Sequence, residues 1–255
     1  MERLRINNGR YLGECIDIDD VLGQIDPLAV QGKWQKIPIA VSPTESLPAY
    51  QRVVAGAQKS VYISAGIHGD EPAGPLAVLE LFRRGNWPAD VNLWVVPCLN
   101  RHGFACNCRG DHEGVDLNRD YRSLKSAVVR AHTRWLDERP AFNASLLLHE
   151  DWESNGFYLY ELNPSLRPSI AERVVEAVRA VCPVDLSPEI EGRPAKGGII
   201  CANPDLQKRP DWPEAFYLVH NKTPVSYTFE APSDFALSTR VTALVTAVEQ
   251  GIKVV

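Results

Sequence analysis

The sequence predicts an α/β fold: a single domain with a central mixed, mostly buried β-sheet flanked by helices. Continuous apolar runs of strand length recur along the chain, as in NLWVVP at residues 92–97, and such runs are typical of buried strands. Segments with apolar residues at helical spacing alternate with these runs. The 255 residues contain no evident linker, so we expect one domain over residues 1–255, with residues 1–50 as a leading segment packed on the main sheet.

The first half of the chain is expected to form mainly strands, with one helix among them. Gly66 and Gly69 end one apolar run, and Pro72 suits the first turn of a helix. The segment from Asn100 to Asp120 is glycine-rich and charged without helical periodicity, which indicates a long loop, and such loops are usually functional. The elements before that loop are strands at Ile37–Val41, Val61–Ala65 and Asn92–Pro97 and a helix at Pro72–Arg84.

The second half is expected to hold three helices and further strands. The last helix has Ser233 as a plausible N-cap and one apolar face that includes Leu244 and Val248. The Pro/Gly-rich stretch from Cys182 to Pro213 is expected to be irregular and to form one wall of a cleft. The remaining elements are helices at Leu124–Glu138 and Pro168–Val181 and strands at Ser145–His149, Gly156–Glu161 and Pro224–Phe229.

Composition excludes several classes of protein. The net charge of −5 and the lack of a clustered basic stripe argue against nucleic acid as a partner. No segment approaches the roughly 18 apolar residues of a membrane span, and the N-terminus has no apolar targeting core. The six cysteines have no framework spacing, so we expect reduced thiols in a cytoplasmic protein. Cys106 and Cys108 are the only close pair; they could bind a metal, but no second cysteine pair completes a four-thiolate site, so we rank metal binding by this pair below a structural or incidental role.

His68 and Glu71, in the stretch VYISAGIHGDEPAG, offer an imidazole and a carboxylate at a strand-to-helix turn. The carboxyl ends of strands in an open α/β sheet are where ligands usually bind. Two histidines and one glutamate are a known ligand set for catalytic zinc, which keeps one position open for water. His149 closes the apolar strand SLLLH and is therefore the candidate third ligand. Taken alone, each of these residues has an ordinary structural explanation.

Glu230 follows the strand PVSYTF and is a candidate general base, because burial at a strand end can raise the pKa of a carboxyl group. Between the two histidines, the loop carries Arg109 and the run GVDLNRD, which includes Asn118 and Arg119. Guanidinium groups suit the recognition of a carboxylate and the stabilisation of an oxyanion. A solvated loop with surface ion pairs is the alternative.

These segments together resemble the zinc carboxypeptidase family, especially its compact bacterial members such as murein peptide amidases. The segments are HGDE at residues 68–71, VDLNRD at 115–120, the strand-end His149 and TFEAP at 228–232. Any one of them is a weak signal, but all four occur in the family's order. The resemblance covers about residues 60–235, most of the chain.

The resemblance implies a zinc carboxypeptidase-like fold in which His68, Glu71 and His149 hold one Zn²⁺. It implies that Glu230 is the general base and acid and that Arg109 polarises the scissile carbonyl. Asn118 and Arg119 would bind the terminal carboxylate of a small peptide. Asp116 would accept a hydrogen bond from His68 and fix its tautomer.

The chain departs from the family in two places. Asp120 stands where the family has asparagine beside the carboxylate clamp, which weakens the expectation that a free terminal carboxylate binds there. No tyrosine matches the family's mobile one: Tyr217 and Tyr227 precede Glu230 at a shorter spacing, and Tyr158 or Tyr160 could approach the site instead. The acidic run at residues 150–153 favours a cationic substrate group or is a solvated loop.

Three functions fit these observations. The first is a zinc hydrolase that cleaves a C-terminal or side-chain amide of a small peptide. The second is a deacylase of N-acyl amino acids, similar to the succinylglutamate desuccinylase and aspartoacylase group, which usually carries an additional β domain after the catalytic one. Only 25 residues follow Glu230, which favours the peptidase. The third is a zinc-containing binding protein without catalysis, against which the retained Glu230 argues.

Overall fold

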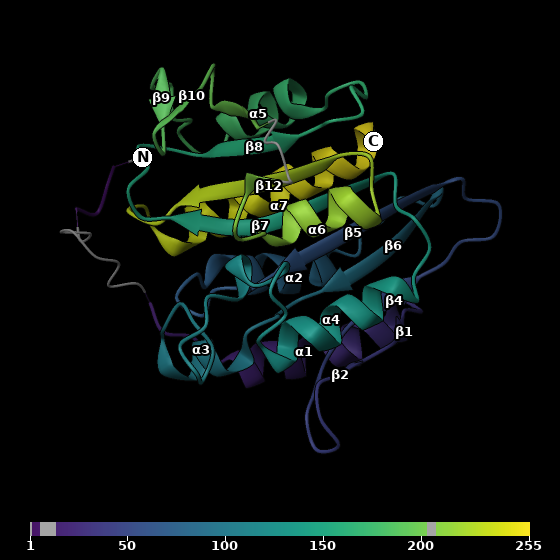
Figure 1. Ribbon diagram of the computed structural model, residues 1–255. Coiled ribbons are helices and arrows are strands. Elements are labelled where there is room, and N and C mark those ends of the chain that lie inside the picture. The colour runs from purple at the N-terminus through teal and green to yellow at the C-terminus, as the bar shows by residue number, and fades with distance from the viewer. Residues whose placement is uncertain (1, 6–13, 203–207) are drawn as a thin grey trace.

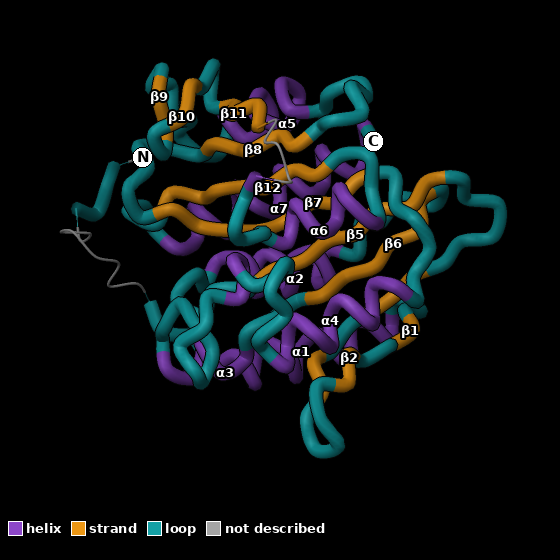
Figure 2. Tube along the Cα trace, viewed as in Figure 1, coloured by secondary structure: helices purple, strands orange, loops and turns teal. Residues whose placement is uncertain are grey.

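The computed structural model describes residues 2–5, 14–202 and 208–255. An eight-stranded sheet runs through the molecule in the order β1-β4-β6-β5-β7-β12-β8-β11 (Figures 1 and 2). The four central strands β6, β5, β7 and β12 are parallel to one another, and β4 and β8 run antiparallel to them on either side. The strands of this sheet are β1 (Gln35–Lys36), β4 (Tyr50–Arg52), β5 (Lys59–Ala65), β6 (Val91–Val96), β7 (Ala144–Asp151), β8 (Tyr158–Leu162), β11 (Ile199–Ala202) and β12 (Ser226–Pro232).

Helices cover both faces of the sheet, and each face has its own hydrophobic core. One core joins the sheet to α1 (Ile18–Gln31), α2 (Ala73–Arg84), α5 (Ala171–Arg179) and α7 (Leu237–Val254). The other joins it to α4 (Ala127–Asp137) and α6 (Glu214–Asn221). Side chains alternate along β12, so that Tyr227 and Phe229 enter the first core while Thr228 and Glu230 face the side of α6. The predicted α/β fold with a mixed central sheet is therefore confirmed.

Four expectations about local structure were wrong or only partly right. The loop expected from Asn100 to Asp120 contains α3 (Arg101–Cys106) and a 3-10 turn, η1 (Leu117–Arg119). Asn100 caps α3 by accepting a hydrogen bond from the Gly103 N–H, and six residues are too few to show helical periodicity. The stretch from Cys182 to Pro213 is not irregular throughout, because it forms the hairpin β9 (Glu189–Ile190) and β10 (Arg193–Pro194) and the sheet strand β11. Residues 203–207 of that stretch lie outside the described part of the chain.

Ser233 is not the N-cap of the last helix. Helix α7 begins at Leu237 with Ala236 as its N-cap residue and no side-chain cap. The hydroxyl of Ser233 instead donates to Glu150 Oε2 over 3.2 Å. The strand expected at Ile37–Val41 is reduced to β2 (Ile39–Ala40), which pairs only with β3 (Ser46–Leu47) in a separate hairpin.

Besides α3, two further helices that were not predicted, α1 and α6, have a role in the architecture. Asp17 caps α1 by accepting from the N–H groups of Asp19 and Asp20, and the helix packs against α2. Helix α6 packs against β7, β8 and β12 near the strand ends that carry the candidate site. None of the described helices is long and apolar enough to cross a membrane.

Candidate metal centre and catalytic cleft

A cavity of about 460 Å³ opens where the parallel strands β5, β7 and β12 end. Because parallel strands deliver their carboxyl ends to one edge, residues far apart in the sequence meet there. Part of the stretch from 182 to 213 contributes to the cavity wall, as predicted, through Glu191, Arg193 and Arg209. Seven of the eight predicted site residues line this cavity: His68, Glu71, Arg109, Asn118, Arg119, His149 and Glu230.

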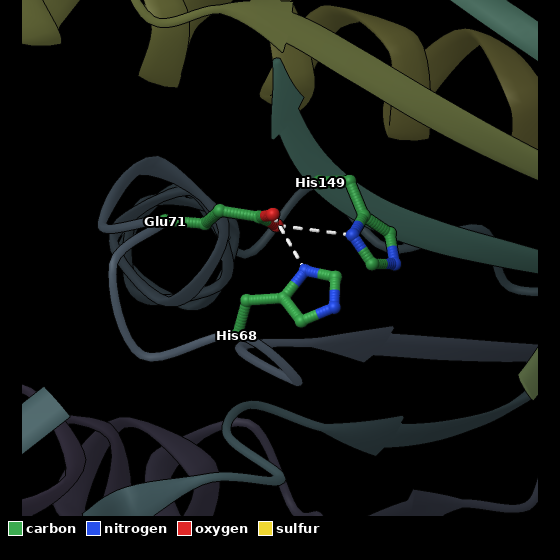
Figure 3. Close-up of side chains that lie close together, drawn as sticks. All are labelled: His68, Glu71 and His149. Carbon is green, nitrogen blue, oxygen red and sulfur yellow. Dashed lines mark hydrogen bonds and ion pairs between the residues drawn. The ribbon is translucent and has the colours of Figure 1, made fainter. Parts of the chain in front are cut away.

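His68, Glu71 and His149 form a compact buried group (Figure 3). Glu71 Oε1 lies 2.6 Å from His68 Nδ1, and Glu71 Oε2 lies 3.0 Å from His149 Nδ1. One donor atom from each residue lies within 4.8 Å of the other two. His68 and Glu71 come from the turn between β5 and α2, whereas His149 lies on β7 (Figure 3).

The charges in this group depend strongly on one another. Burial opposes ionisation of Glu71, but the two imidazoles outweigh burial and hold the pKa of this carboxyl well below its usual range. Burial also opposes protonation of His68, yet Glu71 and Asp116 raise its pKa. For His149 burial prevails and its pKa is lowered. An ionised carboxylate and a neutral imidazole are the forms in which these side chains bind a metal.

The residues fit a divalent cation by their chemistry as well as by their spacing. Each imidazole directs Nδ1 toward the carboxylate, so three donors converge on one region. His68 Nε2 points away and lies 3.3 Å from Asp116 Oδ1, as predicted. A carboxylate on the remote nitrogen of a ligating histidine fixes its tautomer. Two nitrogens and one carboxylate oxygen are a typical set for catalytic zinc.

Asp116 also holds the loop that carries Arg109. Its Oδ2 accepts a hydrogen bond of 2.9 Å from Arg109 Nε, and its Oδ1 accepts one of 2.9 Å from the Asn118 N–H. Arg109 Nη1 lies 3.6 Å from Glu71 Oε1, at the edge of the metal-ligand group. The guanidinium is thereby anchored at one nitrogen and leaves further N–H donors directed toward the cavity.

Glu230 lies beside His149 in the sheet, since the two residues are partners in the β12–β7 ladder. Burial raises the pKa of Glu230 well above its usual range, and the negative charge of Glu71 adds to the effect. A cation between Glu71 and the histidines would oppose that second contribution. A buried carboxyl group with a raised pKa therefore lies next to the group formed by His68, Glu71 and His149.

Asn118 and Arg119 lie on η1, at the wall of the cavity. Asn118 Oδ1 accepts a hydrogen bond of 2.9 Å from the Glu214 N–H, which leaves the amide NH₂ group to donate into the cavity. Arg119 is oriented by Asp211, whose carboxylate lies 3.4 Å from its Nε. Arg119 Nη1 also donates to the Asn118 carbonyl over 2.8 Å, so the guanidinium keeps Nη2 and one N–H of Nη1 as further donors.

Asp120, which departs from the family pattern, is not part of the cavity wall. It is buried, and its carboxylate accepts hydrogen bonds from the N–H groups of Lys125 and Ser126, at 3.0 and 2.7 Å. Both of its oxygens therefore serve the turn before α4. The replacement of an amide by a carboxylate at this position does not place a negative charge at the clamp.

The acidic run after His149 divides into buried and accessible groups. Glu150 borders the cavity, but its side chain is buried and forms an ion pair with Arg240 of α7, with 2.5 Å between Oε2 and Nη1, so its carboxylate is not available to a substrate. Burial raises the pKa of Asp151 to about 6, and this residue lines the cavity with Glu153. Of the four tyrosines considered for the place of the family's mobile one, Tyr158 and Tyr160 line the cavity, whereas Tyr217 and Tyr227 do not.

The buried network beneath Asn118 was not predicted from the sequence. Glu214 accepts hydrogen bonds of 2.9 Å from the hydroxyls of Tyr62 and Ser64, both on β5. Tyr62 also contacts His132 Nε2 at 2.9 Å. The network fixes the start of α6, and hence the N–H group that orients Asn118. A weak signal was present, because Tyr62 and Ser64 alternate with apolar residues in an otherwise buried strand.

Comparison with known proteins gives consistent results. The family model of the succinylglutamate desuccinylase/aspartoacylase catalytic domain matches residues 57–149. Carboxypeptidase SOL1 of Arabidopsis thaliana is 32% identical in a region that covers 32% of this chain and 21% of that protein. The chain therefore matches about a fifth of the length of this relative.

The fold has close counterparts among solved structures. A candidate metallopeptidase from Shewanella denitrificans superposes with a TM-score of 0.78 at 23% identity, covering 96% of this chain and 97% of the other. A metallo-carboxypeptidase from Burkholderia cenocepacia gives a TM-score of 0.69 at 15% identity, over 94% of this chain and 69% of that one. Carboxypeptidase A from Helicoverpa armigera gives 0.66 at 13% identity, over 94% and 73%.

The motifs, the partial family match and the whole-chain superpositions agree. The resemblance predicted from the sequence is confirmed: part of the chain is similar to Carboxypeptidase SOL1 and to the succinylglutamate desuccinylase/aspartoacylase catalytic domain, and the whole chain has the carboxypeptidase fold.

Proposed function

We propose that this protein is a zinc-dependent hydrolase that cleaves an amide bond next to a terminal carboxylate in a small peptide. The observation that carries the proposal is the meeting, in one cavity, of three groups of side chains. These are the buried His68, Glu71 and His149, the adjacent Glu230, and the donor pair Asn118 and Arg119. A metal-ligand group, a proton acceptor and a carboxylate clamp are the parts that such a reaction requires.

Each part has a defined role in the proposal. Arg119 and the Asn118 amide bind the terminal carboxylate of the substrate, because both donate hydrogen bonds into the cavity. Arg109 donates to the scissile carbonyl oxygen and stabilises the negative charge that develops there. Glu230 accepts a proton from the attacking water and later gives it to the departing amine. Asp116 keeps His68 and Arg109 in position through its two hydrogen bonds.

Zinc is the proposed ion, and when bound it acts as a Lewis acid that lowers the pKa of water and polarises the carbonyl. His68 and His149 would each bind through Nδ1, and Glu71 through its carboxylate. Imidazole also suits copper, iron and nickel, so the ligand set alone does not decide among them. The tetrahedral preference and redox stability of zinc favour it for a hydrolytic role.

A peptide substrate receives support from the relatives. The tripeptide-bound cell shape determinant Csd4 of Helicobacter pylori shares the fold with a TM-score of 0.58, at 18% identity over 82% of this chain and 55% of that one. The second candidate, hydrolysis of an N-acyl amino acid, is favoured by the match of residues 57–149 to the desuccinylase/aspartoacylase catalytic domain. Both reactions cleave an amide beside a carboxylate.

A metal-dependent hydrolysis screen tests the proposal and separates the two candidates. Chelated protein would be reloaded with one equivalent of Zn²⁺ and given peptides with a free C-terminal carboxylate, the same peptides as C-terminal amides, γ-linked murein peptides and N-acyl amino acids. We expect zinc-dependent cleavage of free-acid peptides and a large loss of kcat/KM on amidation. The His149→Ala variant is the matched inactive control.

The other possible results of this screen would change or overturn the proposed activity. Cleavage of N-acyl amino acids alone would favour the deacylase. Equal rates on acid and amide peptides would remove the carboxylate clamp from the proposal. A zinc-loaded protein that cleaves none of the four classes, or wild-type activity in His149→Ala, would overturn it.

A further inference from the structure

A second group of metal-binding residue types lies outside the cavity. Cys106 and Cys108, the close pair noted in the sequence, are flanked by histidines at equal distances, in the pattern His102-x₃-Cys106-x-Cys108-x₃-His112. The pair lacks a second pair of cysteines, but the two histidines complete a set of two sulfurs and two nitrogens. Such a set is typical of zinc in tetrahedral coordination.

Helix α3, at the lower left in Figure 1, brings the first two donors together. His102 and Cys106 are four residues apart and therefore lie on one face of the helix. Cys106 Sγ lies 3.6 Å from His102 Nε2. With a Zn–S distance of about 2.3 Å and a Zn–N distance of about 2.0–2.1 Å, the S···N edge of a tetrahedral site is also about 3.6 Å.

The chain then turns back so that the other two donors approach. Asn107 ends the helix in the left-handed conformation, with a φ of 48°, and the Cys108 N–H donates to the Gly103 carbonyl over 2.9 Å. Cys108 lies close enough to Cys106 for the two thiols to interact. The His112 ring packs edge-on against the His102 ring, with 5.6 Å between the centroids.

The backbone that carries these side chains is held in place. Asn100 Nδ2 donates to the carbonyls of Arg109 and Gly110, at 3.1 and 3.0 Å. Asp111 Oδ1 accepts from the Glu113 and Val115 N–H groups, at 3.0 and 2.9 Å. Asp111 is 5% exposed, and its Oδ2 is buried with no hydrogen-bond partner among the described residues. A buried carboxylate oxygen without a donor favours a nearby cation.

We propose that His102, Cys106, Cys108 and His112 form a second metal site, a two-cysteine, two-histidine site for Zn²⁺, on the surface beside the catalytic cavity. Among the described residues, only the His68 group already has its donors within 4.8 Å of one another, so Cys108 and His112 must close in by side-chain rotation. His102, Cys106 and His112 are exposed, whereas Cys108 is half-buried and its thiol donates to the Gly110 carbonyl over 3.5 Å, a contact that the rotation would exchange for the metal.

The second site is separate from the proposed catalytic one but adjoins it. None of its four residues lines the cavity. Arg109 follows Cys108 directly, and Gly103 of α3 packs against Gly69 in the turn that carries His68 and Glu71. A metal ion here therefore fixes the loop from which Arg109 reaches the cavity, as a structural site rather than a reacting one.

Cobalt substitution of the full chain tests this proposal. Reduced, chelated protein would be titrated with Co²⁺ while bound metal and absorbance are measured. We expect two equivalents per chain and an intense near-ultraviolet band from thiolate-to-cobalt charge transfer, which nitrogen and oxygen ligands do not produce. Cys106→Ser and Cys108→Ser should each lose the band and one equivalent.

Two control variants separate this site from the catalytic one. His68→Ala should lose the other equivalent and keep the band, whatever the enzyme's substrate proves to be. Cys201→Ser removes an exposed thiol elsewhere and should keep both equivalents. A reduced wild-type protein without the band would overturn the proposal, and so would a band that persists in Cys106→Ser.

Discussion

Glu230 is the residue on which the proposed chemistry depends most directly. It is held beside His149 by the β12–β7 ladder, and burial raises its pKa. Replacement by glutamine keeps the shape and removes the proton acceptor. We expect Glu230→Gln to lower kcat by about 10²–10⁴-fold, as is typical for loss of a general base, with zinc content unchanged. Steady-state kinetics and metal analysis on the same preparation measure both quantities.

The control for this variant is Glu153→Gln, which neutralises another carboxylate on the cavity wall. It should keep most of the activity, because Glu153 is not adjacent to the metal-ligand group in the sheet. Undiminished turnover in Glu230→Gln would remove Glu230 as the base. A loss of zinc in that variant would instead show that Glu230 supports metal binding.

Asp116 is expected to act through its neighbours. It receives hydrogen bonds from His68 and Arg109, whose combined effect outweighs burial and holds its pKa well below the usual range. Asp116→Asn keeps the size and loses the charge, and we expect zinc affinity to fall about 10–100-fold. Competition with a chromophoric chelator measures this change. Asp137→Asn, which alters a carboxylate that accepts a hydrogen bond from the Tyr217 hydroxyl at the surface, should leave zinc affinity unchanged.

The protonation state of Glu214 affects the stability of the folded protein. Burial raises its pKa from 4.5 to about 7, and the hydroxyls of Ser64 and Tyr62 only partly offset burial. In the folded state Glu214 therefore stays protonated between pH 4.5 and 7 while the unfolded chain loses this proton. The contribution of protonated Glu214 to the free energy of unfolding is fully present below pH 4.5 and is lost as the pH rises through 7.

The side chain of Glu214→Gln resembles the protonated acid and stays uncharged at every pH, so this variant can be compared with wild type. We expect similar free energies of unfolding at pH 4.5 and a variant that is more stable at pH 8 by up to about 3 kcal/mol. Urea unfolding of both proteins across this range gives the difference. A difference that does not change with pH would show that Glu214 does not titrate in this window.

At the scale of elements, the turn between β5 and α2 depends on close contact with α3. A Cβ atom on Gly69 would lie 2.0 Å from the Gly103 carbonyl carbon and 2.4 Å from the Phe104 nitrogen. These neighbours are backbone atoms, so α3 must move to admit a methyl group. We expect Gly69→Ala to destabilise the protein by about 1–3 kcal/mol, as overpacking does, and to weaken zinc binding through His68.

Gly23, in the middle of α1, is the matched control. Among the described residues, no atom outside the backbone of its own helix lies within 4 Å of the position its Cβ would take, so alanine fits there. Since alanine is the better helix former, Gly23→Ala should stabilise the protein by about 0.5–1 kcal/mol. Denaturant midpoints of the two variants should therefore shift in opposite directions. A Gly69→Ala protein as stable as wild type would mean that α3 can shift to admit the methyl group at little cost in free energy.

The elements that could be predicted from the sequence are those in which the pattern of the element's own residues determines its secondary structure. Long apolar strands such as β5 and β7 show their burial directly, and His149 could be placed because it closes such a run. The short strand β11 and helix α3 have too few residues to show a period. Their positions depend on contacts with distant parts of the chain, such as the pairing of β11 with β8.

The same distinction applies to the candidate site. His68, Glu71 and Glu230 were found because strand ends in an open sheet converge. Which carboxylates remain accessible was not predictable, since it depends on partners far away in the sequence. Glu150 is paired with Arg240 of α7, and Asp120 is bonded by the backbone before α4. Only the folded structure distinguishes these two from the acidic groups that face the cavity.

At the scale of the whole molecule, metal binding and folding should be coupled. The His68 group joins β7 to the turn before α2, and an unfolded chain cannot hold these residues together. A ligand that binds only the folded state stabilises it by RT ln(1 + [L]/Kd), about 2.7 kcal/mol at one hundred times Kd. For a chain of this size, this corresponds to a rise of about 5–10 °C in Tm.

Thermal melts with chelator and with Zn²⁺ therefore measure how far the metal sites support the fold. Each protein is compared with its own chelated form, which removes the direct cost of a mutation. In His149→Ala the shift should shrink to what the second site contributes, and in Cys106→Ser to what the catalytic site contributes. Because the two groups share no ligand, the two reduced shifts should add up to roughly the wild-type shift. A wild-type Tm that zinc does not raise would mean that neither group binds the ion in the folded protein.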